Sequence, residues 1–428
     1  MTAAYTTRTS CRVCGYEPLT SLFSLGNQFA SDFPPPGRAR DGPRIPIDLD
    51  LCPQCTLVQA RHTPPPELLY KKHYWYHSST TQTMRDALRD VTAAVERIIS
   101  LKPGDVVLDI GSNDGTLLLS YETPDIALVG VEPADNLATK ENYAHKGLNL
   151  IHGFWGTPEC LERFQRYGKK AKAITACGMF YDLDDPNPFI IDVAKALAPD
   201  GVFVAQLMCL KQTLEKHDVG NFAHEHLEFY TLRSLEKLFH RHGLAMFDVE
   251  ENSVNGGSYR LYAKHLSSGV DGATGRAGRQ RLVDAFTSEE GLSNPDLYDS
   301  FFRELERDKA KVAGFLREQV AAGKTVYILG ASTKGNCIAQ YYRLERTLIS
   351  GASERSPEKV GRVMAGTGIP IVSEEEARAA RPDIFLILPY AFVDEIVERE
   401  RAWLAEGGTF IVPLPTPRLV TRDGEVML

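Results

Sequence analysis

Two pairs of cysteines near the N-terminus restrict the fold of this chain more than any other feature of its sequence. Cys11 and Cys14 form the first pair, and Cys52 and Cys55 form the second. Each pair has the C-x-x-C spacing that lets two thiolates bind one tetrahedral zinc ion. Four cysteines leave no coordination position for water, so we expect a structural zinc ion. A redox pair or four unrelated thiols are the alternatives.

The segment between the two pairs is rich in proline and short of core-forming runs. A segment that cannot bury a large core is the kind that a structural metal holds together. We therefore predict a small zinc-binding module over residues 1–72, which ends in an aromatic cluster.

Size and composition narrow the class of protein further. A chain of 428 residues predicts two or three domains, and 43% hydrophobic with 24% charged residues is ordinary for a globular protein. A net charge of −8 without a basic run argues against nucleic-acid binding. The absence of a long apolar stretch or a leader pattern argues against a membrane partner. We expect a cytoplasmic protein, a monomer or weak homodimer, whose eight cysteines form no disulfides.

A glycine-rich turn follows an apolar stretch at residues 106–110, which predicts a buried strand and then a helix start. Glycines let a backbone bend sharply and approach a ligand closely. A second predicted strand, residues 127–131, ends in an acidic residue, which suits the two hydroxyls of a ribose. The candidate cofactor-binding residues here are Asp109, Gly111, Asn113, Gly115, Glu132 and Pro133.

This combination of glycine turn and acidic strand end resembles class I S-adenosylmethionine-dependent methyltransferases. Further apolar runs at residues 173–177 and 201–207 alternate with helical patterns, so we predict a mostly parallel α/β sheet. Ligands in such sheets lie at the carboxyl ends of the strands, which makes Cys177 a candidate. Trp155 is a candidate to pack on the adenine, although a buried core aromatic is the commoner explanation of such a residue. A doubly wound fold with an unrelated ligand is the alternative. The methyltransferase domain is assigned to residues 73–270.

Two histidines flank a carboxylate at His224, Glu225 and His226, directly before a predicted helix. Histidine exchanges protons near neutral pH, and a neighbouring carboxylate can orient its ring. A surface loop with solvated side chains is the alternative. Downstream, the glycines between Asn255 and Ser258 predict either a strand that approaches a substrate or a simple turn.

The last part of the chain repeats the alternation of strands and helices. Residues 267–294 are rich in Ser, Gly, Asp and Glu and indicate a domain boundary, and a long amphipathic helix is predicted over residues 295–321. A strand at residues 324–329 leads into a loop and helix where Lys334 and backbone N–H groups could hold phosphates. Asn336 stands where a P-loop would need lysine. Residues 271–428 are therefore predicted to be a second Rossmann-like, substrate-binding domain, with a scaffold as the alternative.

Taken together, these motifs resemble the bacterial nucleotide-sugar C-methyltransferases of branched deoxysugar pathways along nearly the full length. The resemblance rests on the four cysteines, on the turn at residues 108–115, on His224-Glu225-His226-Leu227, on Lys334-Gly335-Asn336 and on Ile387-Leu388-Pro389. It implies S-adenosylmethionine and structural zinc as cofactors and a nucleotide-sugar substrate from natural product biosynthesis.

The resemblance also implies roles for individual residues. His226 would be the general base, with Glu225 beside it, and Tyr76 before Ser78-Ser79 would line the site. For the reaction described below, we expect Tyr76, with His224 as a second candidate, to donate hydrogen bonds to the developing enolate oxygen. Two positions depart from the family pattern, because Ala223 stands where tyrosine is common and Tyr181 where histidine is common. The candidate substrate-binding residues are Tyr74, Tyr181, Asn255, Ser258, Lys334 and Asn336.

The implied reaction is methylation of a carbon next to a ketone. We expect His226 to remove a proton and leave an enolate, which attacks the methyl group of S-adenosylmethionine. The alternatives are an O- or N-methyltransferase, or a C-methyltransferase acting on another small acceptor. A zinc-stabilised assembly protein that binds S-adenosylmethionine without turnover is a further alternative. A zinc hydrolase is disfavoured because His224 and His226 lack a third ligand at a suitable spacing.

Overall fold

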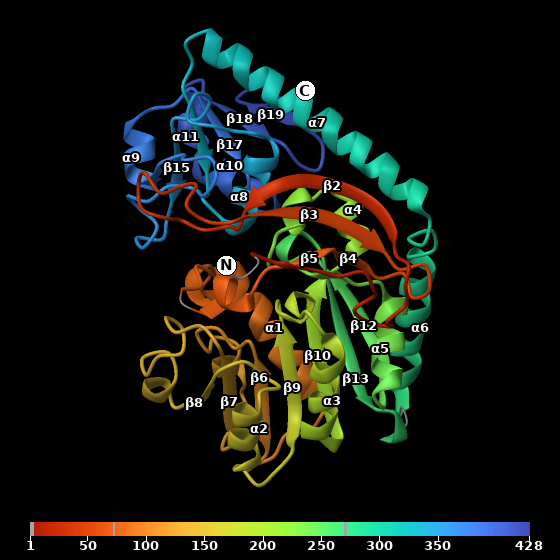
Figure 1. Ribbon diagram of the computed structural model, residues 1–428. Coiled ribbons are helices and arrows are strands. Elements are labelled where there is room, and N and C mark those ends of the chain that lie inside the picture. The colour runs from red at the N-terminus through yellow and green to blue at the C-terminus, as the bar shows by residue number, and fades with distance from the viewer. Residues whose placement is uncertain (1–3, 72, 269–271) are drawn as a thin grey trace.

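The computed structural model describes residues 4–71, 73–268 and 272–428 (Figure 1). Two boundaries predicted above, 72/73 and 270/271, therefore fall on residues outside the described ones. Within the described ranges the chain forms two seven-stranded sheets, one four-stranded sheet and a two-stranded ladder. No helix in these ranges has the length and apolar character that crossing a bilayer requires.

The N-terminal part is antiparallel. Its four strands run in the order β11-β4-β3-β2, and β1 pairs with β5. The strand bounds are β1 Thr6–Thr7, β2 Thr20–Phe29, β3 Arg44–Leu51, β4 Val58–Ala60, β5 His62–Thr63 and β11 Glu228–Phe229.

The expectation that the segment between the cysteine pairs lacks core residues is wrong. Phe23 on β2 is buried, and its ring stacks on Phe302 and packs edge-on against Phe222. These apolar side chains are buried against the rest of the molecule rather than within their own module. For that reason the sequence of this segment alone does not reveal that its apolar residues are buried.

The first seven-stranded sheet runs in the order β12-β13-β10-β9-β6-β7-β8. All its strands are parallel except β13, which is antiparallel to both of its neighbours. The predicted parallel α/β sheet is thus confirmed. The bounds are β6 Val106–Ile110, β7 Ala127–Glu132, β8 Asn149–His152, β9 Ala171–Cys177, β10 Leu197–Met208, β12 Leu244–Asn252 and β13 Ser258–His265.

Helices cover both faces of this sheet. They are α1 Gln82–Ile98, α2 Pro158–Gln165, α3 Pro186–Ala196, α4 Leu210–Glu215, α5 Leu232–Arg241 and α6 Gly272–Ser288. Short helical turns connect them: η1 Glu67–Lys71, η2 Ser78–Thr80, η3 Leu118–Ser120, η4 Ala144–Lys146, η5 Phe180–Asp182, η6 Val219–Asn221, η7 Val254–Gly256 and η8 Leu266–Ser268.

The structure differs from the sequence expectation after Gly115. The helix expected there is only the short turn η3, because Pro124 and the next strand follow within a few residues. Within residues 267–294, where the composition indicated a domain boundary, residues 272–288 form helix α6, which packs on β12. Gly278, Leu282, Ala285 and Glu289 lie buried at helical spacing, a pattern that the polar composition concealed.

The second seven-stranded sheet runs in the order β16-β15-β14-β17-β18-β19-β20, with antiparallel pairing only at β18-β19 and β19-β20. Its strands are β14 Val326–Leu329, β15 Gly351–Glu354, β16 Ile371–Ser373, β17 Ile384–Ile387, β18 Thr409–Val412, β19 Arg418–Thr421 and β20 Gly424–Met427. Its helices are α7 Pro295–Ala321, α8 Thr333–Tyr341, α9 Glu374–Ala379, η9 Tyr390–Phe392, α10 Val393–Arg399 and α11 Arg401–Ala405.

The β2–β3 hairpin lies between the two larger parts, beneath the long helix α7 (Figure 1). Its end is fixed to α8 by a reciprocal pair of hydrogen bonds. The Phe29 N–H donates to Gln340 Oε1 at 2.9 Å, and Gln340 Nε2 donates to the Phe29 carbonyl at 3.0 Å. The N-terminal part therefore joins the first sheet to the second, which brings both to one cavity.

Candidate active site

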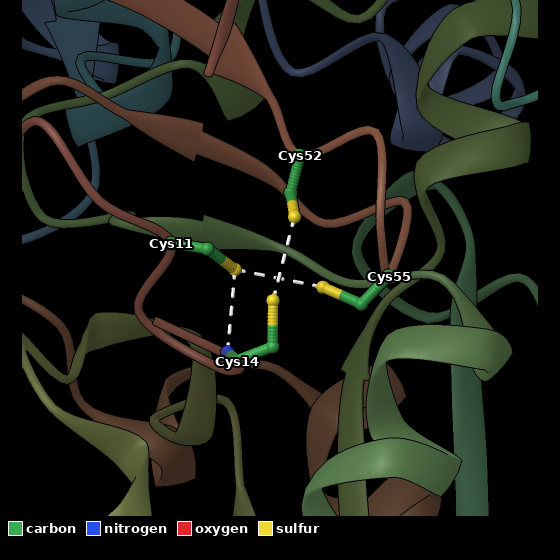
Figure 2. Close-up of side chains that lie close together, drawn as sticks. All are labelled: Cys11, Cys14, Cys52 and Cys55. Atoms are coloured by element: carbon green, nitrogen blue, oxygen red, sulfur yellow. Dashed lines mark hydrogen bonds between the residues drawn. The ribbon is translucent and has the colours of Figure 1, made fainter. Parts of the chain in front are cut away.

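The four predicted zinc ligands form a compact cluster (Figure 2). Their sulfur atoms all lie within 4.8 Å of one another, with Cys11 to Cys55 and Cys14 to Cys52 both at 3.5 Å. A tetrahedral zinc with Zn–S bonds of about 2.3 Å separates its sulfurs by roughly 3.8 Å. All four are free thiols, and three of them are buried. This donor set fits a closed structural zinc site.

Polar contacts attach the cluster to the N-terminal strands β4 and β5 and to helix α5 of the first sheet. Arg12, between the first two cysteines, donates to the Ala60 carbonyl and to Thr63 Oγ1 at 2.6 Å. Arg241 on α5 donates to the Val13 carbonyl at 2.7 Å. A metal that holds these turns therefore also fixes how the N-terminal part lies against α5.

A cavity of about 470 Å³ opens where the carboxyl ends of both parallel sheets face each other. Residues 66–81, the glycine turn after β6, the histidine loop and the start of α8 all contribute to its walls. Cavities of this size suit a small-molecule ligand. Because segments from all three parts line it, none of them forms the site alone.

The glycine turn depends on the absence of side chains at its two ends. Gly111 has φ +73°, and a Cβ there would lie 2.8 Å from Met179 Cγ. Glu132, at the end of β7, accepts the N–H groups of Asn113 and Ala134, both at 2.8 Å. Burial raises the pKa of Glu132 to about 7, although the two hydrogen bonds act to lower it. Each carboxylate oxygen keeps a free lone pair for a ribose hydroxyl.

The same turn positions the segment that carries Tyr76. Asn113 donates from Nδ2 to the Tyr76 carbonyl at 3.0 Å and accepts the Ser78 N–H at 2.9 Å. Asp114 accepts the Ser79 N–H at 2.9 Å. The Tyr76 phenol is protonated at neutral pH, as tyrosine ordinarily is, so this hydroxyl can donate a hydrogen bond in the cavity that it lines.

His226 is held in one tautomer by the backbone. Its Nδ1 lies 2.6 Å from the Asn221 carbonyl, which can only accept, so Nδ1 carries the hydrogen and Nε2 is the basic nitrogen. The ring packs edge-on against Tyr181, with 4.8 Å between centroids. Burial, assisted by the charge of Lys334, lowers the pKa of His226 to about 3. The imidazole is therefore neutral at pH 7.

The other two members of the triplet behave differently from the sequence expectation. The Asn221 carbonyl, rather than the Glu225 carboxylate, orients the His226 ring. Glu225 still lines the cavity, and burial raises its pKa to about 7. His224 lies outside the cavity, where its Nε2 contacts the Ile45 carbonyl at 3.0 Å and burial lowers its pKa to about 4.

The second sheet contributes a further part of the cavity wall, next to the histidine loop. Lys334, at the start of α8, donates to the Asn255 carbonyl at 3.0 Å and lies 3.6 Å from Asp218 Oδ2. Tyr390 in η9 donates to the same Asp218 oxygen at 3.0 Å. One cationic side chain, Lys334, thus lines the part of the cavity that the structure describes.

Comparison with known proteins places this geometry in a family. Over 419 residues the chain is 32% identical to C-methyltransferase NovU of Streptomyces niveus, across 96% of this chain and 97% of that protein. The chain belongs to the C-methyltransferase family. Family matches cover residues 11–70 ("Putative zinc binding domain"), 81–249 ("Methyltransferase domain") and 253–415 ("C-methyltransferase C-terminal domain").

Some solved methyltransferases resemble part of this C-methyltransferase. Magnesium protoporphyrin IX methyltransferase from Synechocystis, with bound SAH, is 12% identical, covers 44% of this chain and 90% of its own, and gives a TM-score of 0.34. An S-adenosylmethionine-dependent methyltransferase from Clostridium acetobutylicum is 14% identical over 44% of this chain and 93% of its own, also with a TM-score of 0.34.

S-adenosylmethionine and zinc are the cofactors of this C-methyltransferase, and its residues fit both. For the methyl donor, Glu132 beside the glycine turn has the acceptors that a ribose requires, and Trp155 also lines the cavity. The buried Trp155 Nε1 has no hydrogen-bond partner among the described residues. A bound ligand could accept from this nitrogen.

Most of the residues chosen from the sequence line the cavity of the C-methyltransferase. They are Tyr74, Tyr76, Gly111, Asn113, Glu132, Pro133, Trp155, Cys177, Tyr181, Glu225, His226, Asn255, Ser258 and Lys334. Ala223, which with Tyr181 departs from the family pattern, lines the cavity as well.

Four chosen residues lie outside the cavity lining. Asp109 is buried on β6, where Thr175 Oγ1 donates to it at 2.6 Å and burial raises its pKa to about 7. Gly115 faces Leu148, and a Cβ there would lie 2.5 Å from that side chain. Asn336 is fully buried on α8, and His224 faces β3.

Among the polar cavity residues that sequence reasoning missed are Asp182, Asp218 and Tyr390. Tyr390 follows β17 directly, so the rule that ligands lie at the carboxyl ends of strands could have found it. Asp182 directly follows Tyr181 and shares its position after β9. Asp218 lies in a polar stretch after α4, where no sequence pattern marks it.

Proposed function

We propose that this C-methyltransferase methylates a carbon next to the ketone of a nucleotide-linked sugar, with His226 as the base. The observation that carries the proposal is the tautomer of His226. Its Nδ1 is committed to the Asn221 carbonyl, which leaves Nε2 free to accept a proton in the cavity that the cofactor turn also lines. The ring is neutral at pH 7 because its pKa is lowered.

In the proposed reaction, S-adenosylmethionine supplies an electrophilic methyl group. His226 Nε2 accepts the proton from the carbon beside the ketone, and the C–H electron pair moves into the enolate. Tyr76 donates a hydrogen bond to the enolate oxygen. The enolate carbon then forms its bond to the methyl group as the methyl–sulfur bond breaks, and His226 later returns its proton to water.

Several residues would hold the acceptor while this occurs. Tyr181 packs edge-on against the His226 ring, and Tyr74 and Ser258 line the same cavity. Lys334 would bind the diphosphate, assisted by Asn255, while the buried Asn336 would support α8. We assign residues 1–72 to the zinc module, 73–270 to cofactor binding and catalysis, and 271–428 to the nucleotide end of the substrate.

The decisive experiment is a mass-spectrometric assay with S-adenosylmethionine and a panel of 4-keto nucleotide sugars in deuterated water. We expect a gain of one methyl group and enzyme-dependent deuterium in unreacted ketosugar, since enolate formation exchanges that proton. NMR of the product distinguishes C- from O- or N-methylation. Cofactor binding with neither signal across the panel would exclude this acceptor class.

The role of Lys334 is tested separately. Lys334→Ala should raise the KM for the nucleotide sugar without changing the KM for S-adenosylmethionine, because its ammonium is held at the Asn255 carbonyl and does not belong to the cofactor turn. An equal rise in both values would contradict a specific diphosphate contact.

A further inference from the structure

One contact between the two larger parts lies in the cavity wall and has no role in the reaction above. Tyr390 Oη, from the second sheet, donates to Asp218 Oδ2 at 3.0 Å. Asp218 follows α4 beside the first sheet and is only 1% exposed. A buried carboxylate requires hydrogen bonds or a cation to offset its lost hydration. Both of the groups that face this oxygen come from the second part.

The second of these groups is Lys334. Its Nζ lies 3.6 Å from Asp218 Oδ2 and donates to the Asn255 carbonyl at 3.0 Å. The ammonium is therefore held by two groups of the first part, although its own helix belongs to the second. A flexible side chain with four rotatable bonds is thereby restricted to one region of the cavity.

Gly256 provides the space for this arrangement. It has φ +95°, and a Cβ there would lie 2.4 Å from Tyr390 Oη and 3.2 Å from Asp218 Oδ2. Lys216 also donates to the Gly256 carbonyl. The sequence left open whether this glycine serves a close approach or a simple turn. In this structure the Tyr390 hydroxyl occupies the place that a side chain would take.

We propose that Asp218, Gly256, Lys334 and Tyr390 form a latch that closes the two parts over the cavity and presents Lys334 to the acceptor. Asp218 and Tyr390 are positioning residues in this latch, since they act through Lys334. The ligand class is a diphosphate-bearing acceptor, and in this respect the inference rests on the function proposed above. A general structural bridge would have no need to line the cavity, whereas Asp218, Asn255, Lys334 and Tyr390 all do.

The test compares Tyr390→Phe with Tyr341→Phe in the full-length, zinc-loaded protein. Tyr341 also donates to a carboxylate, Glu306 at 2.6 Å, but both residues belong to the second part and lie outside this cavity. Hydrogen–deuterium exchange reports on residues 254–257 and 390–392 without any ligand. Calorimetric titrations then use thymidine 5′-diphosphate, uridine 5′-diphosphate and S-adenosylmethionine as probes.

We expect Tyr390→Phe to speed exchange in both segments and to weaken diphosphate binding about tenfold, as for a lost hydrogen bond to a charged group. Binding of S-adenosylmethionine should not change, and Tyr341→Phe should match the wild type in every measurement. Asp218→Asn, which keeps the shape but removes the charge beside Lys334, should also weaken diphosphate binding. Combined with Tyr390→Phe, it should produce less than the sum of the two effects.

Two results would overturn the latch. Unchanged exchange in Tyr390→Phe would show that its hydroxyl does not hold the parts together. Faster exchange with unchanged diphosphate affinity would show that the contact does not position Lys334. A wild-type protein that binds neither diphosphate would instead refute the proposed acceptor class, while faster exchange in Tyr390→Phe would still support closure by the latch. The two failures are therefore distinguishable.

Discussion

Replacing His226 by asparagine tests the proposed base most directly. The backbone carbonyl of Asn221 accepts from Nδ1 at 2.6 Å, and an asparagine amide can donate to the same carbonyl. The variant should therefore keep the loop in place. It has no basic nitrogen at the position of Nε2, so it cannot take the proton.

The size of the effect follows from this difference. A positioned general base contributes roughly 10²- to 10⁴-fold to a rate, which corresponds to about 3–5 kcal/mol in the activation barrier. We expect kcat to fall by that factor while the Kd for S-adenosylmethionine stays unchanged. Because the pKa of His226 is lowered to about 3, protonation of this ring should cause no loss of wild-type rate between pH 8 and pH 5.

The assay is enzyme-dependent deuterium uptake into the ketosugar, measured beside methyl transfer. His240→Asn is the matched control, because His240 is exposed on α5 and does not line the cavity. If folded His226→Asn still exchanges deuterium and transfers methyl at the wild-type rate, another group is the base and the reasoning fails. A loss of deuterium exchange together with methyl transfer supports His226.

Three further predictions concern the zinc, the cofactor turn and acid stability. Cys52→Ser should lose bound zinc and have a lower melting temperature, since structural zinc supplies on the order of 10 kcal/mol in small domains. An unchanged zinc content by mass spectrometry would contradict the four-cysteine site. Glu132→Gln replaces one acceptor of a backbone N–H by a donor, and we expect about tenfold weaker S-adenosylmethionine binding by calorimetry. Burial lowers the pKa of His224 to about 4, so below pH 6.5 the unfolded chain takes up a proton that the folded chain does not. The contribution of His224 to the free energy of unfolding should fall by about 1.4 kcal/mol per pH unit between pH 6.5 and pH 5. In His224→Asn, the free energy of unfolding measured in urea should therefore depend less steeply on pH.

Local patterns in the sequence were sufficient for much of the fold. The cysteine pairs, the turn between β6 and β7, and helix α7 at residues 295–321 were all predicted where the structure has them. Each depends on residues close in sequence, so spacing and periodicity carry the information. Helix α6 was missed because its buried stripe consists partly of glycine and alanine, which composition does not distinguish from a linker.

The candidate site shows the same division between local and distant information. The sequence alone identified His226, Glu132 and Lys334 as chemically capable residues, and the structure brings all three to one cavity. Only the tertiary structure shows that a backbone carbonyl orients His226, or that Tyr390 meets Asp218 across 172 positions of sequence. These contacts depend on how two sheets and the β2–β3 hairpin pack together. Side-chain packing between distant segments has no periodicity along the chain. The sequence therefore determines which side chains are chemically capable, and the tertiary structure determines which of them come into contact.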